Sequence, residues 1–238
     1  MARIYASVLG DWQTAPELQT DVPFQLDDAD PELRTDVAAI GRRSRDLDDR
    51  QCDRVLNARS VLDVELEFER PGDHEAAARV ARFIALALAA GGHAAYLETS
   101  ARVLGPRALD RVEVDDRRTL LHLCVQVLMD EVAVTTEGMQ CFDLPDVVAR
   151  HDGARAAPRD DDAPEPLPGE YDDADAAQAA CFGFAARMVC DRWRPTSGSV
   201  FRASESAPWY TAKLEAAGPE AADDPFVNPR GRWVLQRR

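Results

Sequence analysis

The sequence lacks the short motifs that mark common catalytic and nucleotide-binding sites. Its 238 residues contain no G-x-G-x-x-G or G-x-x-x-x-G-K-S/T phosphate loop, no G-x-S-x-G turn, no H-E-x-x-H motif and no D-x-D-x-D-G loop. The five cysteines are odd in number and widely spaced, and no two form a C-x-x-C pair. We therefore expect reduced, mostly buried thiols and no resident cofactor.

Long apolar runs are also lacking. The longest, Phe83–Ala90, has eight residues, far fewer than the roughly 20 that a membrane-spanning helix requires. The N-terminal stretch carries an apolar run that Asp11 interrupts. This run is too short to be the apolar region of a signal peptide. From these features and the reduced cysteines we expect a cytoplasmic protein with no membrane partner.

Positive charge is in short supply. The chain has 28 lysines and arginines and 43 aspartates and glutamates, which gives a formal net charge of -15 and a pI of about 4.7. Nucleic acids and anionic membranes bind basic surfaces, so this balance argues against both as the main partner. It is compatible with docking onto a basic protein. Hydrophobic residues make up 45% of the chain, which is ordinary for a globular protein with a sizeable core.

A strand with one acidic face is predicted over Val61–Glu69. Apolar and acidic residues alternate there, so one set should face a core and the other water. The apolar set is Leu62, Val64, Leu66 and Phe68, and the acidic set is Asp63, Glu65, Glu67 and Glu69. Four acids on one face could bind a cation, but an exposed face that resists edge pairing is the simpler interpretation.

A helix over 74–90 should follow, with Asp73 as its N-cap and Gly91-Gly92 as its stop. A strand over 93–98 and a helical turn over 101–104, capped by Thr99 or Ser100, should come next. Earlier in the chain, we expect a strand over 3–9 and a helix over 31–40 that Asp30 caps.

The stretch Arg118–Asp146 is predicted to contain a central hairpin. Leu121, Leu123, Val125 and Val127 alternate with His122, Cys124, Gln126 and Leu128, which is the period-2 pattern of a strand. We therefore expect strands over 119–128 and 131–137, followed by a turn in which Gly138 supplies a special backbone angle.

Composition changes after Asp152. The stretch 153–173 is rich in proline and acidic residues and should be a loop without a core of its own. A second helix is predicted over 174–193, and short strands over 199–203, 209–215 and 232–236. Together these elements predict one α+β domain over 1–238, with a mixed, mostly antiparallel sheet and the helices 74–90 and 174–193 packed on one face.

Two sets of residues are candidates for a site. His122, Cys124 and Cys141 could hold zinc if the loop folds back, or the first two could form a thiol nucleophile pair. The simpler interpretation is that His122 and Cys124 fill the covered face of a strand. The second set consists of aromatic residues that either anchor the core or bind a partner. They are Trp193, Trp209, Tyr210 and Trp233.

The segment Thr136–Asp146, TEGMQCFDLPD, resembles the T-x-G-L/M-x-x-F-G-x-P-E/D turn of the DUF4261 family of bacterial proteins. Asp143 stands where the family pattern usually has glycine. The order of elements is similar over roughly 61–150. The resemblance implies a cytoplasmic α+β protein, and some members are thought to lie near polymorphic-toxin or secretion loci. Because the family is functionally uncharacterised, it supplies no catalytic residues.

The absence of motifs and the negative charge favour a non-catalytic protein-binding protein, accessory or immunity-like, with an acidic surface. Its protein partner is unknown, and a basic protein would suit that surface. One alternative is a small metal-dependent or thiol hydrolase that uses His122 and Cys124. Another is a structural subunit of a larger assembly.

Overall fold

The computed structural model describes residues 2–68, 74–109, 116–151, 173–218 and 227–238, which form two compact units. The first unit comprises Met1–Val125 and Gln140–Asp143, and the second comprises Gln126–Met139 and Leu144–Arg238. Each unit has its own sheet. A single domain over 1–238 stays a prediction, because two compact units can still fold together. Within the described ranges, no helix is both long and apolar enough to cross a bilayer.

The first unit is built on an antiparallel sheet with the strand order β2-β3-β1-β4-β5. Its strands are β1 (Ala2–Gly10), β2 (Gln25–Asp28), β3 (Ser60–Phe68), β4 (Ala94–Leu97) and β5 (Arg102–Leu104). Its helices are α1 (Pro31–Ser44), α2 (Asp49–Leu56), α3 (Glu75–Ala89) and α4 (Arg117–Cys124). It also has the short 3₁₀ turns η1 (Glu98–Ser100), η2 (Pro106–Leu109) and η3 (Met139–Phe142). The first residue of η3, Met139, is assigned to the second unit.

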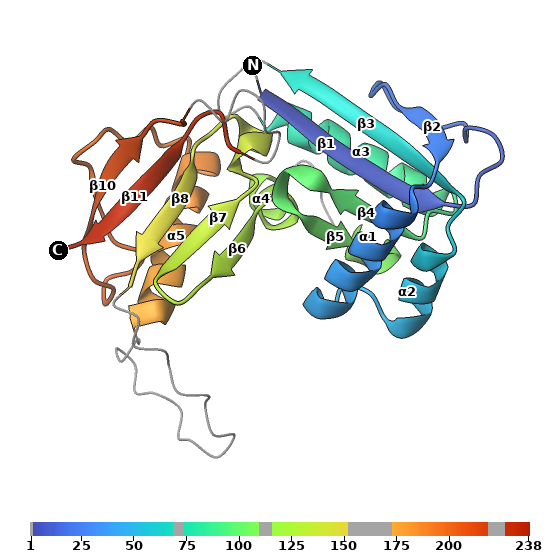
Figure 1. The fold of residues 1–238 in the computed structure, drawn as a ribbon. Helices are drawn as coiled ribbons and strands as arrows, with labels where there is room; N and C mark the ends of the chain where they lie inside the picture. Colours follow the sequence, from blue (N-terminus) through green and yellow to red (C-terminus); the bar gives the residue numbers. More distant parts are fainter. Residues whose placement is uncertain (1, 69–73, 110–115, 152–172, 219–226) are drawn as a thin grey trace. The chain divides into compact units, whose positions relative to one another are not determined.

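The two faces of this sheet carry different helices. The alanine-rich helix α3 packs against β1 and β3, and Figure 1 shows it behind the sheet while α1 lies in front. Leu9 and Val61 face each other on the front side, where α1 and α2 cover them. Their shared core cluster comprises Leu9, Val37, Ala38, Leu47, Cys52, Val55, Ala58, Val61, Ala94 and Val103. Because side chains alternate along a strand, the odd-numbered residues of β1 and β3 continue this front face.

The second unit contains a six-stranded sheet with the order β6-β7-β8-β11-β10-β9. All of its strand pairs are antiparallel except β8 with β11. Its strands are β6 (Gln126–Met129), β7 (Ala133–Glu137), β8 (Asp146–Arg150), β9 (Val200–Phe201), β10 (Tyr210–Glu215) and β11 (Arg232–Arg237). The helix α5 (Asp173–Val189) packs on β6, β7 and β8 (Figure 1).

The predicted fold class is confirmed, since the protein is α+β with mostly antiparallel sheets. The predicted strands over 61–69, 93–98, 131–137 and at the C-terminal end are present. Asp30 caps α1 through its carboxylate, which accepts from the backbone N–H of Glu32. Gly138 has the positive φ of 100° that its turn requires.

Other expectations are wrong. The structure has two sheets instead of one, so α3 and α5 cover different sheets. Residues 101–104 form the strand β5 instead of a helical turn. The capping role of Asp73 and nearly all of the predicted loop 153–173 lie outside the described residues.

The predicted strand over 119–128 is mostly the helix α4. Asp116 caps this helix, because its carboxylate accepts from both the backbone N–H and the hydroxyl of Thr119. Leu120, Leu121 and Cys124 then lie within one helical face and are buried. The same leucine-rich run satisfies both periodicities, and the cap selects the helix.

Candidate functional site

The front face of the first sheet is polar wherever α1 and α2 leave it uncovered. Pairs of residues face each other there across β1 and β3: Arg3 with Glu67, Tyr5 with Glu65, and Ser7 with Asp63. Arg3 forms ion pairs with Glu65 at 3.1 Å and with Glu67 at 2.7 Å. Asp63, Glu65 and Glu67 of the predicted acidic face therefore lie on one side of β3, beside a hydroxyl-bearing stretch of β1. Glu69 lies outside the described residues.

A hollow of about 480 Å³ opens on this face. Three carboxylates line it, from Asp63, Glu65 and Glu98, and the segment that leads into β2 forms another wall. We call it the acidic hollow, and its lining is Tyr5, Ala6, Pro23, Phe24, Gln25, Asp63, Val64, Glu65 and Glu98. Among these described lining residues none is basic.

The Ser7 hydroxyl lies between two of these carboxylates. Its Oγ is 2.6 Å from Asp63 Oδ1 and 2.9 Å from Glu98 Oε1. A hydroxyl has one hydrogen to donate, so both contacts are hydrogen bonds at once only when one carboxyl group is itself protonated and donates to Ser7. The structure thus holds two acids within reach of a single donor.

Burial raises the pKa of Asp63 and of Glu98. Hydrogen bonding to Ser7 opposes this rise, but the one hydroxyl proton serves one carboxylate at a time. The charge of Asp27 raises the pKa of Asp63 further, and the charge of Asp63 does the same for Glu98. A positive charge placed in the acidic hollow would relieve both the burial and the mutual repulsion.

The chemistry of the acidic hollow favours an organic cation over a metal ion. In the described ranges no group of three or more histidine, cysteine, aspartate or glutamate side chains is arranged to hold a metal. Carboxylate oxygens accept hydrogen bonds from ammonium and guanidinium groups, and Tyr5 offers ring surface for the carbon stem of a lysine or arginine.

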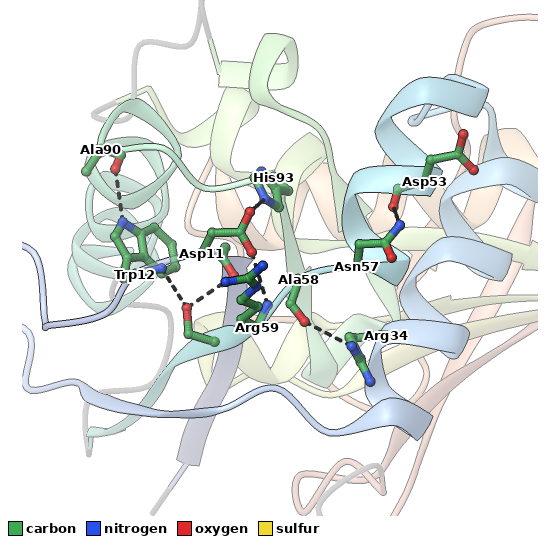
Figure 2. A network of polar contacts seen from close by, with 11 residues as sticks. Asp11, Trp12, Arg34, Asp53, Asn57, Ala58, Arg59, Ala90 and His93 are labelled. Carbon is green, nitrogen blue, oxygen red and sulfur yellow. Dashed lines mark hydrogen bonds and ion pairs between the residues drawn. The ribbon is translucent and has the colours of Figure 1, made fainter.

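A second hollow of about 510 Å³ lies near the far end of β1, and Asp11, Trp12 and Ser60 of its lining already have hydrogen-bond partners. As Figure 2 shows, Asp11 accepts from His93 at 3.0 Å, and it also accepts from the backbone N–H of Arg59 at 3.2 Å. These contacts, the His93 bond foremost, lower the pKa of Asp11. Trp12 donates through Nε1 to the carbonyl of Ala90 at 2.9 Å.

Trp12 also fixes the backbone beneath it. A Cβ at Gly10 would lie 2.5 Å from the ring atom Cζ3 of Trp12, so the ring can take this place only over a glycine. The backbone N–H of Trp12 donates to Ser60 Oγ at 2.8 Å, which ties the end of β1 to β3. The network around Asp11 and Trp12 therefore serves as a structural joint.

The three residues predicted as possible metal ligands do not converge. On α4, His122 and Cys124 point about 200° apart, because successive residues of a helix are about 100° apart. Cys124 and Cys141 do meet, since their thiols hydrogen bond, and Thr99 Oγ1 is 3.2 Å from Cys141 Sγ. The bond with Cys141 and burial raise the pKa of Cys124, which disfavours a thiolate nucleophile.

The predicted aromatic set divides between core and surface. Tyr210 and Trp233 are buried, as the core-anchor interpretation expects, and partner binding by these two stays a prediction. Trp193 is half-buried and packs edge-on against Phe184 at a centroid distance of 4.9 Å. Only Trp209 of this set is well exposed, at 47%.

Sequence reasoning missed one ionisable group in the second unit. The carboxylate of Asp146 accepts from Asn228 Nδ2 at 2.8 Å and from the backbone N–H of Met139 at 3.1 Å. Burial raises the pKa of Asp146 to about 7, although these bonds oppose the rise. Its own N–H donates to the carbonyl of Gly231. Asp146 therefore joins the 139–146 turn to the segment before β11.

No family model matches the chain, and no curated protein and no solved structure is similar to it. The likeness of Thr136–Asp146 to the DUF4261 turn stays a prediction. Asp143, at the glycine position of that pattern, has a φ of 52°, a left-handed conformation that aspartate tolerates better than most residues. The function has to be argued from the acidic hollow itself.

Proposed function

We propose that the chain is a non-catalytic protein-binding protein, accessory or immunity-like, that receives a basic side chain of its partner in the acidic hollow. The observation that carries this proposal is the placement of Asp63 and Glu98 around one hydroxyl donor, Ser7. Such a pair is electrostatically unsatisfied when both acids are ionised, and a lysine or arginine would complete it.

Long-range charge supports the same proposal. A net charge of -15 attracts a basic protein and speeds its encounter with the acidic hollow. A cytoplasmic location, and a partner that is neither nucleic acid nor membrane, belong to this proposal. The buried thiol of Cys124 and the divergence of His122 give the hydrolase alternative no comparable support.

Capture of the partner at increasing salt tests the proposal. The immobilised protein should recover a basic partner at about 0.1 M salt and lose it near 1 M, as the Debye length falls from about 10 Å to about 3 Å. The double variant Asp63→Asn/Glu98→Gln should fail to recover the same partner. A matched variant, Asp36→Asn/Asp53→Asn, removes two acids from the exposed surfaces of α1 and α2 and should still recover it.

Two results would contradict the proposal. One is equal recovery of the partner by the Asp63/Glu98 variant and the matched control. The other is the absence of any salt-sensitive basic partner among the proteins that mass spectrometry identifies.

A further inference from the structure

A third hollow, with a different character, lies in the second unit, where β10 begins and β11 ends. Tyr210 pairs with Arg237 there, and Figure 1 shows the C-terminal end beside these two strands. The hollow measures about 380 Å³. We call it the arginine–tryptophan hollow, and its lining is Val200, Pro208, Trp209, Arg237 and Arg238.

The indole of Trp209 is exposed but held in place. The guanidinium carbon of Arg202 lies 4.6 Å from the centroid of the Trp209 ring, and Arg202 Nη1 donates to the carbonyl of Glu205 at 3.1 Å. On the other side, the backbone N–H of Arg238 donates to the carbonyl of Trp209 at 2.9 Å. An exposed tryptophan that is already ordered loses little side-chain entropy on binding, which is the property of an interface hot spot.

The arginines beside this indole are also positioned by the fold. Arg238 Nε donates to Thr211 Oγ1 at 3.1 Å, and Arg237 sits on β11 opposite Tyr210. Among the described residues that line the hollow, none is acidic. The described segment 227–238 has four arginines and no acid, in a chain whose overall charge is -15. The side-chain charge of this segment is therefore opposite in sign to that of the protein as a whole.

We propose that the arginine–tryptophan hollow binds an acidic peptide segment of a partner protein that carries one apolar side chain among its acids. The apolar side chain would pack on Trp209, Pro208 and Val200, and the flanking carboxylates would accept from the guanidinium groups of Arg237 and Arg238. This binding is independent of the acidic hollow, which lies in the other unit and takes the opposite charge.

The lining favours a peptide over other anions. Val200, Pro208 and Trp209 give the hollow an apolar wall that a small inorganic anion leaves unused. A nucleic acid gains affinity by neutralising many phosphates along a basic track. Here a few arginines gather at one corner of an acidic chain, which suits one or two carboxylates.

Fluorescence anisotropy of a labelled Glu-Glu-Phe-Glu-Glu peptide, titrated with the full chain, tests this inference. We expect Trp209→Ala and Arg237→Gln/Arg238→Gln each to weaken binding by about tenfold or more. The matched control Arg230→Gln/Arg232→Gln removes two exposed arginines from the same segment and should change affinity less than about twofold. Trp209→Phe, which keeps an aromatic face, should recover much of the lost affinity.

The outcomes are separable from those of the acidic hollow, because Asp63→Asn/Glu98→Gln should bind this peptide as well as the unmodified protein does. Equal affinity of Trp209→Ala and the unmodified protein would overturn the inference. So would undiminished binding of Gln-Gln-Phe-Gln-Gln, or displacement of the labelled peptide by a single-stranded oligonucleotide at lower concentration than by unlabelled peptide. Far-UV circular dichroism shows whether each variant is folded. If Trp209→Ala does not fold, Arg237→Gln/Arg238→Gln decides, because undiminished peptide binding by that variant would also overturn the inference.

Discussion

The acidic hollow of the first unit and the arginine–tryptophan hollow of the second hold charges of opposite sign at different depths. Asp63 and Glu98 are half-buried, and burial raises both of their pKa values. The charges of the arginine–tryptophan hollow lie on arginines next to a tryptophan that is 47% exposed. Partly buried acids have already lost part of their hydration, and a cation offsets that loss. Exposed arginines beside an aromatic ring remain hydrated until the ligand binds.

The largest expected effect tests whether the two units are separate domains or two parts of a single domain. Phe83 and Phe184 are fully buried, one in each unit. Phe83→Ala and Phe184→Ala should each lower the free energy of unfolding by about 3–5 kcal/mol. Because the chain crosses between the units three times, we expect one shared transition in differential scanning calorimetry. Two transitions, each shifted by only one variant, would overturn the single-domain prediction.

The next effect concerns Asp146, the acid that the second unit encloses. Its pKa rises from an ordinary 3.8 to about 7 on folding. The folded state therefore holds this proton more tightly, so the associated stability is complete below about pH 4 and is lost as the pH rises through 7. Between pH 5 and pH 8 the loss is about 2.5 kcal/mol by linkage.

Asp146→Asn removes this titration. Its free energy of unfolding, measured with urea at pH 5 and pH 8, should fall less over that range than that of the unmodified protein. Thr136→Val is a useful comparison, because it removes one hydrogen bond to Asp146 and leaves the titrating group in place. Parallel pH profiles of Asp146→Asn and the unmodified protein would show that the pKa of Asp146 does not lie in this range in the folded state.

Sequence patterns predict the elements of both units better than the sites within them. Alternation identifies β3 and its acidic face, because one strand contains both sets of residues. It misidentifies α4, because Leu120–Cys124 fits two periodicities and only the carboxylate of Asp116 decides between them. A local pattern is therefore reliable where one period fits and a cap or turn agrees with it.

The two hollows and the Asp146 joint depend on contacts between distant parts of the chain. Ser7 meets Glu98 across 91 positions, and Asp146 meets Asn228 across 82. No periodicity reports such contacts. For Trp209 the sequence offered a hint, since aromatic residues cluster near the C-terminal end, but Trp233 in the same cluster is buried. Trp233 lies within β11 and is covered, whereas Trp209 precedes β10 and is exposed.

A reciprocal experiment tests whether the two hollows bind their ligands independently. Asp63→Asn/Glu98→Gln should weaken binding of the basic partner by about 2 kcal/mol, which is roughly 30-fold in affinity. The same variant should leave the affinity for the acidic peptide unchanged. Arg237→Gln/Arg238→Gln should do the reverse. Isothermal titration of both variants against both ligands measures the four affinities. Loss of both ligands in either variant would show that the two hollows are not independent sites.

The smallest expected effect is the pH dependence of the acidic hollow. A basic side chain binds the ionised carboxylates, and burial raises the pKa of both Asp63 and Glu98. Affinity for the basic partner should therefore rise with pH from about 4 until both acids have lost their protons, by a few-fold to about tenfold. The arginine–tryptophan hollow should show no such rise above about pH 5, because arginine stays charged and the carboxylates of the free peptide are ionised.

Ser7→Ala separates the role of the shared hydroxyl from that of the acids. Without the donor, one opposing influence on the two pKa values disappears, so the rise in affinity should move to higher pH. Affinities measured from pH 4 to pH 8 for Ser7→Ala and the unmodified protein would reveal that displacement. If the pH dependence of affinity is the same for Ser7→Ala and the unmodified protein, the Ser7 hydroxyl does not influence the pKa values of Asp63 and Glu98. The carboxylates of the acidic hollow would then be solvated, as the exposed arginines of the second unit are.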